Sequence, residues 1–228
     1  MVKHWPGGGS GEGGRDAHFG TGKYAVYPGG RFDLGLIPFI EGAFNLPGKT
    51  KMASAVMPYY TISYNQDPSG ENVGNGFSHY IIQQLLRDQN NYEGVVCTDW
   101  GIVRDYKQVY EHKGTPWGME TASLAERRLK CFEAGVDQLG GAKDNDISIE
   151  AYKLWEEKYG AESARERFEL SARRLLTNIF NVGVFENPYV DPSVAAEVVG
   201  CEEFVAAGYD AQLKSIVMFL PSTTISAS

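Results

Sequence analysis

The stretch YEGVVCTDWG, residues 92–101, decides the architecture that the rest of the chain indicates. It holds a short run rich in β-branched residues, which ends at Asp99, Trp100 and Gly101. A continuous apolar run of this kind is typical of a strand that is buried on both faces, as in a parallel sheet. A carboxylate directly after such a strand projects from the edge of the sheet.

Strand-like and helix-like segments alternate on both sides of this stretch. The helix-like segment 77–89 is amphipathic, with Phe77, Ile81 and Leu85 on one face. Alternation of this kind is the βαβ pattern of a parallel sheet. The expected strands cover 52–60 (ended by Pro58), 92–99 and 136–140, and the expected helices between them cover 77–89 and 121–135.

Polar residues gather where each expected strand ends. These are the pairs Tyr59–Tyr60, Asp99–Trp100 and Asp137–Gln138. In a β/α barrel that edge carries the catalytic groups. A doubly wound sheet is the competing architecture and binds its ligand at a switch point. The fold class is therefore α/β, and no specific cofactor fingerprint favours the doubly wound alternative.

Further helices are expected outside this alternation. Thr121 is expected to cap the helix over 121–135, and Gly135 to end it. The segment 185–192 reads as an extended, proline-rich connector. The remaining expected helices cover 31–44 (interrupted at Pro38), 147–160, 162–183 and the chain from 192 to about 217.

Composition narrows the classes of function. The 228 residues carry a formal net charge of -8, which argues against non-specific binding of nucleic acid. No apolar run is long enough to span a membrane, and no signal peptide is present. The three cysteines, Cys97, Cys131 and Cys201, are widely spaced, which argues against a disulfide framework or a zinc site and favours free, mostly buried thiols.

The glycine-rich run near the start matches nucleotide-binding motifs only formally. Residues 9–14 fit G-x-G-x-x-G, but no useful apolar strand precedes them and no helix opens after them. The later FGTGKY has Tyr24 where a P-loop needs Ser or Thr, and Ala17 where it needs glycine. Charged and aromatic side chains also crowd the segment, unlike a solvated tether. An ordered loop with close backbone approaches is the expected structure.

Four motifs in order resemble glycoside hydrolase family 3, the β-glucosidase and β-xylosidase family. They are VKHWPGGG, MPYY, GVVCTDWG and NVGVFENPYVDP, and the resemblance runs from Lys3 to about Val217. It implies a partial TIM-type (β/α)8 barrel, roughly its second half, over residues 1–190. Residues 191–228 would then form a helical linker and a truncated tail.

The resemblance also implies roles for individual residues. Asp99 matches the family's catalytic nucleophile, and Trp100 would be a platform for the sugar. Lys3 and His4 match a pair that binds sugar hydroxyls. Without the resemblance, a turn carboxylate, a buried indole and two exposed side chains at a fraying terminus are the ordinary alternatives.

Tyrosine follows the expected strand 52–60 at two successive positions. Tyr60 matches the family tyrosine that lies near the nucleophile, with Tyr59 as the alternative if the register shifts. Trp117 and Glu120 could reach the mouth of the pocket, whereas Arg104 reads as a surface or loop-bridging charge.

The general acid/base is less clear, because the family usually places a Glu on a second domain. The chain ends in MFLPSTTISAS instead, and Lys3 stands almost at its start, so truncation at both ends is expected. Asp16 and His18 supply one substitute, in which the carboxylate orients the imidazole as acid/base. Hydrogen bonding that stabilises the loop is the alternative role for this pair.

The expected function is that of a retaining β-glucosidase acting on terminal non-reducing β-D-glucosyl residues. A non-catalytic carbohydrate-binding remnant and an unrelated α/β scaffold are the alternatives. β-Linked glucosides or short oligosaccharides are the expected partners, with no cofactor, metal, nucleic acid or membrane. Two unpaired sheet edges would favour a homo-oligomer or a complementing half. The preferred sugar and the compartment of the intact protein are left open: without a signal peptide the chain reads as cytoplasmic, whereas an intact homologue could be secreted or periplasmic.

Overall fold

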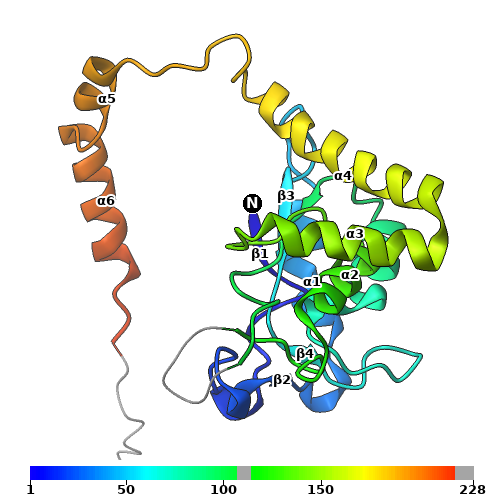
Figure 1. Ribbon diagram of the computed structural model, residues 1–228. Helices are drawn as coiled ribbons and strands as arrows, with labels where there is room; N and C mark the ends of the chain where they lie inside the picture. The colour runs from blue at the N-terminus through cyan, green and yellow to red at the C-terminus, as the bar shows by residue number, and fades with distance from the viewer. Residues whose placement is uncertain (107–113, 219–228) are drawn as a thin grey trace, which may run out of the picture. The chain divides into compact units, whose positions relative to one another are not determined.

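A computed structural model describes residues 1–106 and 114–218, which divide into two compact units. The first unit is Met1–Asn181 and the second is Val182–Ser228. Figure 1 shows the sheet and most of the helices in the first unit. The two units are defined by how compactly their residues pack, and they do not test the expected limit of the catalytic domain at residue 190, which stays a prediction.

A three-stranded parallel sheet, in the order β1-β3-β5, organises the first unit. Its strands are β1 (Val2–Trp5), β3 (Ala55–Pro58) and β5 (Val95–Val96), with Val56 paired to both outer strands. All residues of β3 and β5 are buried, as expected for apolar runs covered on both faces. The predicted α/β class with parallel strands is confirmed.

The expected strand over 136–140 does not form. Only one parallel bridge, between Cys97 and Gln138, continues the sheet there. The Asp137 carboxylate takes the N–H of Val96 at 3.0 Å, so a side chain replaces part of the backbone ladder. The chain then turns at Gly141, which has a positive φ of 68°.

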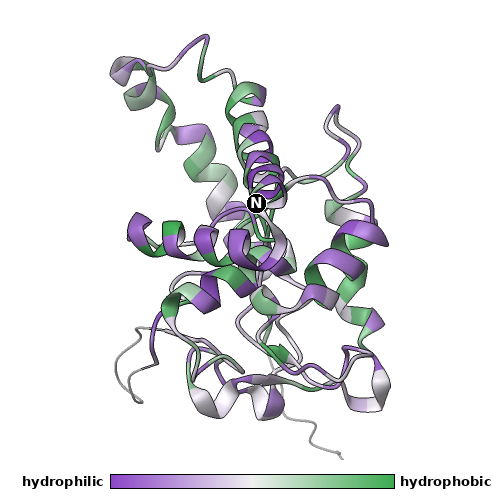
Figure 2. Cartoon of the chain, turned by 45° about the vertical axis from the view of Figure 1, so that its right-hand side comes forward, coloured by the Kyte–Doolittle hydropathy of each residue, from purple (hydrophilic) through white to green (hydrophobic). Residues whose placement is uncertain are grey.

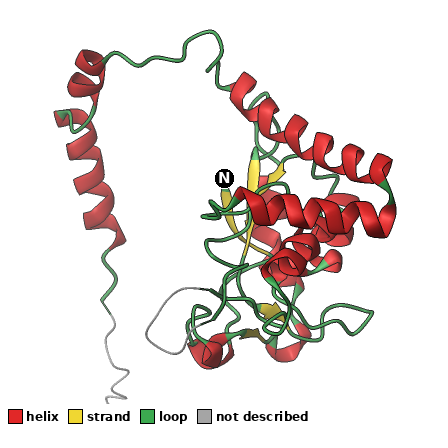
Figure 3. Cartoon of the chain, viewed as in Figure 1, coloured by secondary structure: helices red, strands yellow, loops and turns green. Residues whose placement is uncertain are grey.

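The glycine-rich segment is an ordered loop, as predicted. It contains short 3-10 turns, η1 (Glu12–Gly14) and η2 (Gly20–Gly22), and leads into β2 (Tyr24–Ala25). A further turn, η3 (Pro28–Gly30), follows, and β2 pairs in parallel with β4 (Ile62–Ser63), as Figure 3 shows. A Cβ on Gly22 would lie 2.2 Å from the carbonyl oxygen of Asp16, so the loop closes tightly at a position where only glycine fits.

Helical segments follow each strand of the main sheet. The expected helix over 31–44 forms as α1 (Asp33–Ile37) and the π-helical η4 (Pro38–Ala43), so it changes at the proline that was expected to interrupt it. The amphipathic segment after β3 begins with the 3-10 turn η5 (Asn75–Phe77) and continues as η6 (Tyr80–Asp88). Ile81 and Leu85 of η6 are buried against the core, so the predicted face is confirmed.

The helix before residue 135 starts later than expected. It is α2 (Leu124–Ala134), and Ser123 caps it by accepting from the N–H of Glu126, whose carboxylate accepts from Ser123 in return. Thr121 is therefore not the cap, because the reciprocal capping box at Ser123 satisfies the first N–H groups. The helix ends at Gly135 with a φ of 104°, as expected.

Two longer helices complete the first unit. They are α3 (Asn145–Tyr159) and α4 (Ala161–Asn181), close to the expected ranges. Phe168 of α4 joins α2 and α3, because its ring packs edge-on against Phe132 at 4.9 Å and against Tyr152 at 5.0 Å. Figure 2 shows hydrophobic and hydrophilic residues alternating around these helices, as expected of helices that cover a core on one side.

Over its described residues, 182–218, the second unit has two helices where one was expected. These are α5 (Pro192–Val198), capped by Asp191, and α6 (Glu202–Ser215). Gly200 interrupts them with a φ of 73°, a conformation that a helix cannot continue. Within residues 1–106 and 114–218, no helix is both long and apolar enough to cross a membrane.

Candidate active site

A carboxylate and an imidazole meet at the carboxyl edge of the main sheet. Asp99 follows β5, and its Oδ2 lies 3.1 Å from Nε2 of His4, which belongs to β1. Because β3 lies between these strands, the contact spans the sheet edge. Parallel strands bring their carboxyl ends to one edge, which explains how residues so distant in sequence come together.

The Asp99 carboxylate is buried, with 5% of the residue exposed, and it is held in its ionised form. Burial pushes its pKa upward, but hydrogen bonds from His4, from the backbone N–H of Trp100 and from Tyr60 outweigh that effect, so the pKa lies below its ordinary value. Its Oδ1 accepts the Trp100 N–H at 2.7 Å. One oxygen thus makes a local turn contact, and the other faces His4.

Tyr60 lies on the same edge, just after β3. Its ring is buried, and its hydroxyl donates to the Trp100 carbonyl oxygen at 2.8 Å. Burial, then the charge of Asp99, raise the pKa of Tyr60 far above its ordinary value. The neighbouring Tyr59 packs its ring against His4 at 4.7 Å. Of the two tyrosines, Tyr60 is the one that helps to lower the pKa of the Asp99 carboxylate, while its hydroxyl proton goes to the Trp100 carbonyl.

The indole of Trp100 lies at the surface, with 66% of the residue exposed. This overturns the alternative that it is simply buried. A Cβ on Gly141 would lie 2.4 Å from the Trp100 ring, so the indole rests on a backbone that only glycine leaves open. The N–H of Gly140 donates to Thr98 Oγ1 at 2.8 Å, which ties the two loops together. Trp100 is thus presented by a braced pair of loops.

The Asp16–His18 pair lies against this site. His18 Nδ1 is 2.7 Å from Asp16 Oδ1, the same oxygen that accepts the backbone N–H of His18. The imidazole packs edge-on against the Tyr60 ring at 4.7 Å. The pair therefore makes the loop-stabilising contact, and its role as acid/base stays a prediction.

Lys3 makes a different contribution from His4. Its side chain is exposed, and within residues 1–106 and 114–218 it has no hydrogen bond or ion pair. The Lys3–His4 and Trp5–Pro6 peptide bonds are cis. Trp5 is wholly buried, packs edge-on against Phe39 at 5.2 Å, and donates its indole N–H to the Ile81 carbonyl, which anchors the end of β1.

A pocket of about 300 Å³ opens beside the indole of Trp100. The described residues that line it are His18, Trp100, Gly101, Arg104, Gly114, Thr115, Gly141 and Lys143. None of these is acidic. In the part of the chain that the structure describes, no group of three or more His, Cys, Asp or Glu side chains is placed to hold a metal ion.

Trp117 and Glu120, the two residues considered for the mouth of the pocket, have other partners. Trp117 is buried and donates its indole N–H to the Ala17 carbonyl oxygen at 2.9 Å, so it braces the glycine-rich loop. The Glu120 carboxylate lies 3.6 Å from Lys23. Neither reaches the pocket in the way considered. Arg104 donates to the Gly141 carbonyl at 2.8 Å, which confirms the loop-bridging role.

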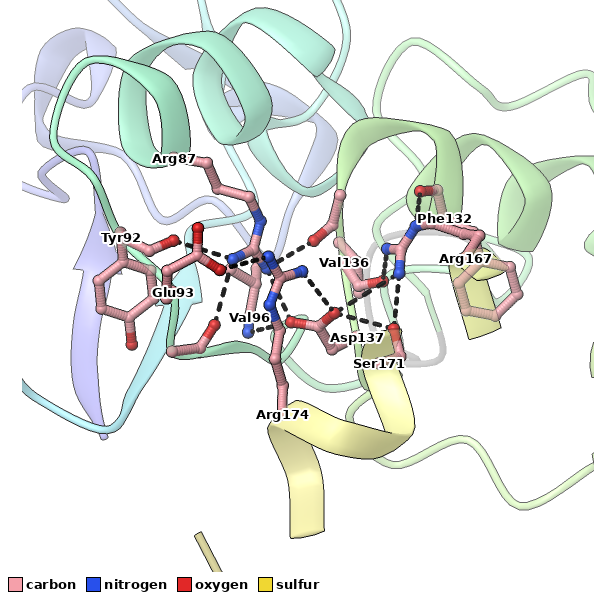
Figure 4. Close-up of polar contacts among 12 residues, drawn as sticks. Arg87, Tyr92, Glu93, Val96, Phe132, Val136, Asp137, Arg167, Ser171 and Arg174 are labelled. Carbon is pink, nitrogen blue, oxygen red and sulfur yellow. Dashed lines mark hydrogen bonds and ion pairs between the residues drawn. The ribbon is translucent and has the colours of Figure 1, made fainter. Parts of the chain in front are cut away.

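Asp137 does not join the site, although it follows an apolar run as Asp99 does. Its side chain is wholly buried and accepts from Arg87 at 2.7 Å and from Ser171 at 2.8 Å (Figure 4). Arg174 and Arg167 lie 3.3 and 3.6 Å away. Asp137 therefore holds η6 and α4 to the sheet.

The sequence pattern did not single out Thr115 and Lys143 as pocket residues. Both lie in loops far from the recognised motifs, and only the folding of the loops around Trp100 brings them together. No local sequence signal distinguishes them from ordinary loop residues.

Several proteins resemble this chain in sequence. No protein-family model matches the chain. The chain is 36% identical over 229 residues to β-glucosidase C of Emericella nidulans, covering 99% of this chain and 34% of that protein. It is 33% identical over 231 residues to a periplasmic β-glucosidase/β-xylosidase of Dickeya chrysanthemi, covering 96% of this chain and 34% of that protein.

A solved structure agrees with these relatives. The glycoside hydrolase family 3 β-N-acetylglucosaminidase of a Paenibacillus strain is similar with a TM-score of 0.58 and 25% identity, over 83% of this chain and 32% of that one. The chain spans about a third of the length of the curated relatives it matches.

An α/β fold with an ionised carboxylate at the carboxyl edge of its parallel sheet, together with these relatives, defines the class as the glycoside hydrolases. Within that class, the chain belongs to glycoside hydrolase family 3 and is β-glucosidase-like.

Proposed function

We propose that the chain carries the nucleophile and part of the sugar site of a retaining β-glucosidase. The observation that supports this most is the buried, ionised carboxylate of Asp99, held at the sheet edge by His4, Tyr60 and the Trp100 N–H. In such an enzyme a carboxylate attacks the anomeric carbon and forms a covalent glycosyl-enzyme, which water then hydrolyses. The substrates would be terminal non-reducing β-D-glucosyl residues of β-linked glucosides or short oligosaccharides.

The residues around Asp99 have separate roles in the first step of this reaction. His4 orients the Asp99 carboxylate through its Nε2, and the exposed ammonium of Lys3 binds a sugar hydroxyl. Trp100 presents an exposed ring to the sugar. As the Asp99–carbon bond forms, the bond from the anomeric carbon to the leaving oxygen breaks, and that oxygen takes a proton.

His18 is the candidate in this chain for giving that proton. The Asp16 carboxylate accepts from Nδ1, which leaves Nε2 as the nitrogen that can face the leaving oxygen. Proton donation of this kind typically contributes about 10²–10⁴-fold to a rate. A Glu on a second domain, the usual arrangement in the family, is the other source of the proton.

The architecture proposed for the whole enzyme is a (β/α)8 barrel. Three neighbouring parallel strands followed by helical segments support it, with roughly the second half of the barrel over residues 1–190 and a linker and tail over 191–228. In that arrangement β1 has one edge without a partner among the described strands. A homo-oligomer or a complementing half would pair it.

Labelling with an activated fluoroglucoside tests the proposal, because such a substrate traps the glycosyl-enzyme. We expect the intact chain to gain the mass of one fluoroglucosyl group, and Asp99→Asn to gain none. Asp146→Asn, at an exposed position in the first turn of α3, is the matched control and should label normally. Equal labelling of Asp99→Asn, or none of the intact chain, would overturn the proposed nucleophile.

A chain that binds sugars without turnover is the second candidate. It is favoured by one observation: no Asp or Glu is among the described residues that line the pocket beside Trp100. Binding of a β-glucoside by calorimetry with no labelling would support this candidate over the catalytic one.

A further inference from the structure

The pocket beside Trp100 has a charge pattern that the proposed function does not explain. Trp100, the residue after Asp99, lines this pocket together with His18. If Asp99 attacks a glucoside, the leaving group would therefore lie in this pocket. The inference below rests on the proposed function for that placement. The nature of the group comes from the lining residues themselves.

Among the described residues that line the pocket, two side chains are cationic and none is acidic. Arg104 and Lys143 are both exposed, and within residues 1–106 and 114–218 neither forms an ion pair. Arg104 is not a loose side chain, because one of its Nη2 N–H groups donates to the Gly141 carbonyl oxygen at 2.8 Å. A guanidinium anchored in this way keeps other N–H groups in a fixed fork, which matches carboxylate and phosphate geometry.

A buried hydroxyl adds a second, independent feature. Thr115 is 5% exposed, and its Oγ1 is buried without a hydrogen-bond partner among the described residues. Leaving a buried polar group unpaired is costly, and native proteins seldom do so without a reason. Oγ1 itself is closed off from solvent, so an oxygen of a bound group would become its partner only when the Thr115 side chain turns toward the pocket that the residue lines.

The remaining lining is flat and open. The Trp100 indole forms one wall, and Gly101, Gly114 and Gly141 line the pocket beside it. His18 also lines the pocket, and its Nδ1 is hydrogen-bonded to Asp16. An aromatic ring can stack on the indole while a substituent on it meets the cations.

We propose that this pocket binds an oxyanion, a carboxylate or a phosphate, carried by the leaving group of a β-glucoside. Arg104 and Lys143 supply the charge and Thr115 a hydroxyl. The pocket thereby selects acidic aryl glucosides or acidic sugar conjugates over neutral ones of the same shape.

Binding by calorimetry at low salt and neutral pH tests the proposal independently of turnover. The probes are para-carboxyphenyl β-D-glucoside and its neutral partner, para-carbamoylphenyl β-D-glucoside. We expect the carboxylate to bind about tenfold more tightly, the gain typical of a charge-assisted hydrogen bond. Arg104→Gln and Lys143→Gln should each remove most of that preference. Lys153→Gln, an equal loss of charge at an exposed position of α3 outside the pocket, should keep it.

The variants differ in what else they disturb. Arg104→Gln also removes the bond to Gly141, so a change in the loops would weaken both probes equally. Lys143→Gln has no such contact among the described residues and isolates the charge. A preference that is absent from the intact chain, or that survives in both variants, overturns the proposal, as does a failure of both probes to bind at millimolar concentration.

Inorganic phosphate distinguishes an attached anion from a free one. If phosphate alone binds as tightly as the carboxyphenyl glucoside and displaces it, the anion is not carried by the leaving group, and the proposal is wrong in that respect. Fluoroglucoside labelling reports on Asp99 separately. Labelling without a carboxylate preference would overturn only this inference, and a preference without labelling would overturn only the proposed nucleophile.

Discussion

Replacing Asp137 by Asn should destabilise the first unit severely. The carboxylate is wholly buried and lies 2.7 Å from Arg87, 3.3 Å from Arg174 and 3.6 Å from Arg167. Burial lowers the pKa of Arg167 to about 10 even though the Asp137 charge opposes this, so the cluster depends on its one buried carboxylate. Asn is nearly the same size, so the change removes a charge without leaving a cavity.

The magnitude follows from the uncompensated guanidinium groups. Removing one partner of a buried ion pair costs about 3–5 kcal/mol, because the other charge stays buried and unpaired. Glu93 is exposed and pairs with Arg174 at 3.0 Å, so it compensates only the outermost of the three. The Asn side chain can still accept one of the hydrogen bonds to Oδ1 or Oδ2, which places the expected cost near the lower end of that range.

Urea unfolding followed by far-ultraviolet circular dichroism measures this cost. With a slope of about 2 kcal/mol per molar urea, a loss of about 3 kcal/mol shifts the midpoint down by about 1.5 M. Asp146→Asn, which removes an exposed carboxylate from α3, should shift it by less than about 0.3 M. A shift for Asp137→Asn no larger than that of this control would refute the reasoning that the cluster needs its charge.

Three further predictions concern the site and the fold. The pKa of Asp99 lies below its ordinary value, so its charge is lost only as pH falls through that lowered pKa; fluoroglucoside labelling should therefore persist to a lower pH than an ordinary aspartate would allow, and His4→Ala should move that acid limit upward. Gly141→Ala should cost about 1–3 kcal/mol in urea unfolding and change the fluorescence of the adjacent indole, because a Cβ there meets the ring at 2.4 Å on a backbone with positive φ; an unchanged spectrum and midpoint would show that the ring does not rest there. Ser123→Ala should cost about 1 kcal/mol and Thr121→Ala less than about 0.5 kcal/mol, and the reverse order would show that the helix starts earlier than in the structure.

Most of the fold could be predicted because it depends on local patterns. Buried runs such as 55–58 and 95–96 are apolar on both faces, and the helices between them carry one apolar face, so chain order alone predicts a parallel sheet. Pro38 and Gly135 also act locally, and the structure changes or ends a helix at both. The missing strand over 136–140 was not predictable in this way, because the Asp137 side chain takes the Val96 N–H and only part of the backbone ladder forms.

The candidate site was only partly predictable from the same patterns. The resemblance placed Asp99, His4 and Tyr60 at one edge, and the structure brings these three side chains together. It did not indicate that His4 contacts the carboxylate itself. Thr115 and Lys143 carry no motif, so nothing local connects them with Trp100.

The sequence by itself determined the α/β class, the order of strands and helices and the family, since these depend on periodicity and on motifs that are contiguous in the chain. Two aspartates each follow an apolar run, and only the tertiary structure shows what each of them contacts. Asp99 lies beside an imidazole and a tyrosine at the edge of the sheet, whereas Asp137 contacts three guanidinium groups and is wholly buried. The physical reason is that the burial and charge partners of a side chain come from segments far along the chain, and no local pattern contains them.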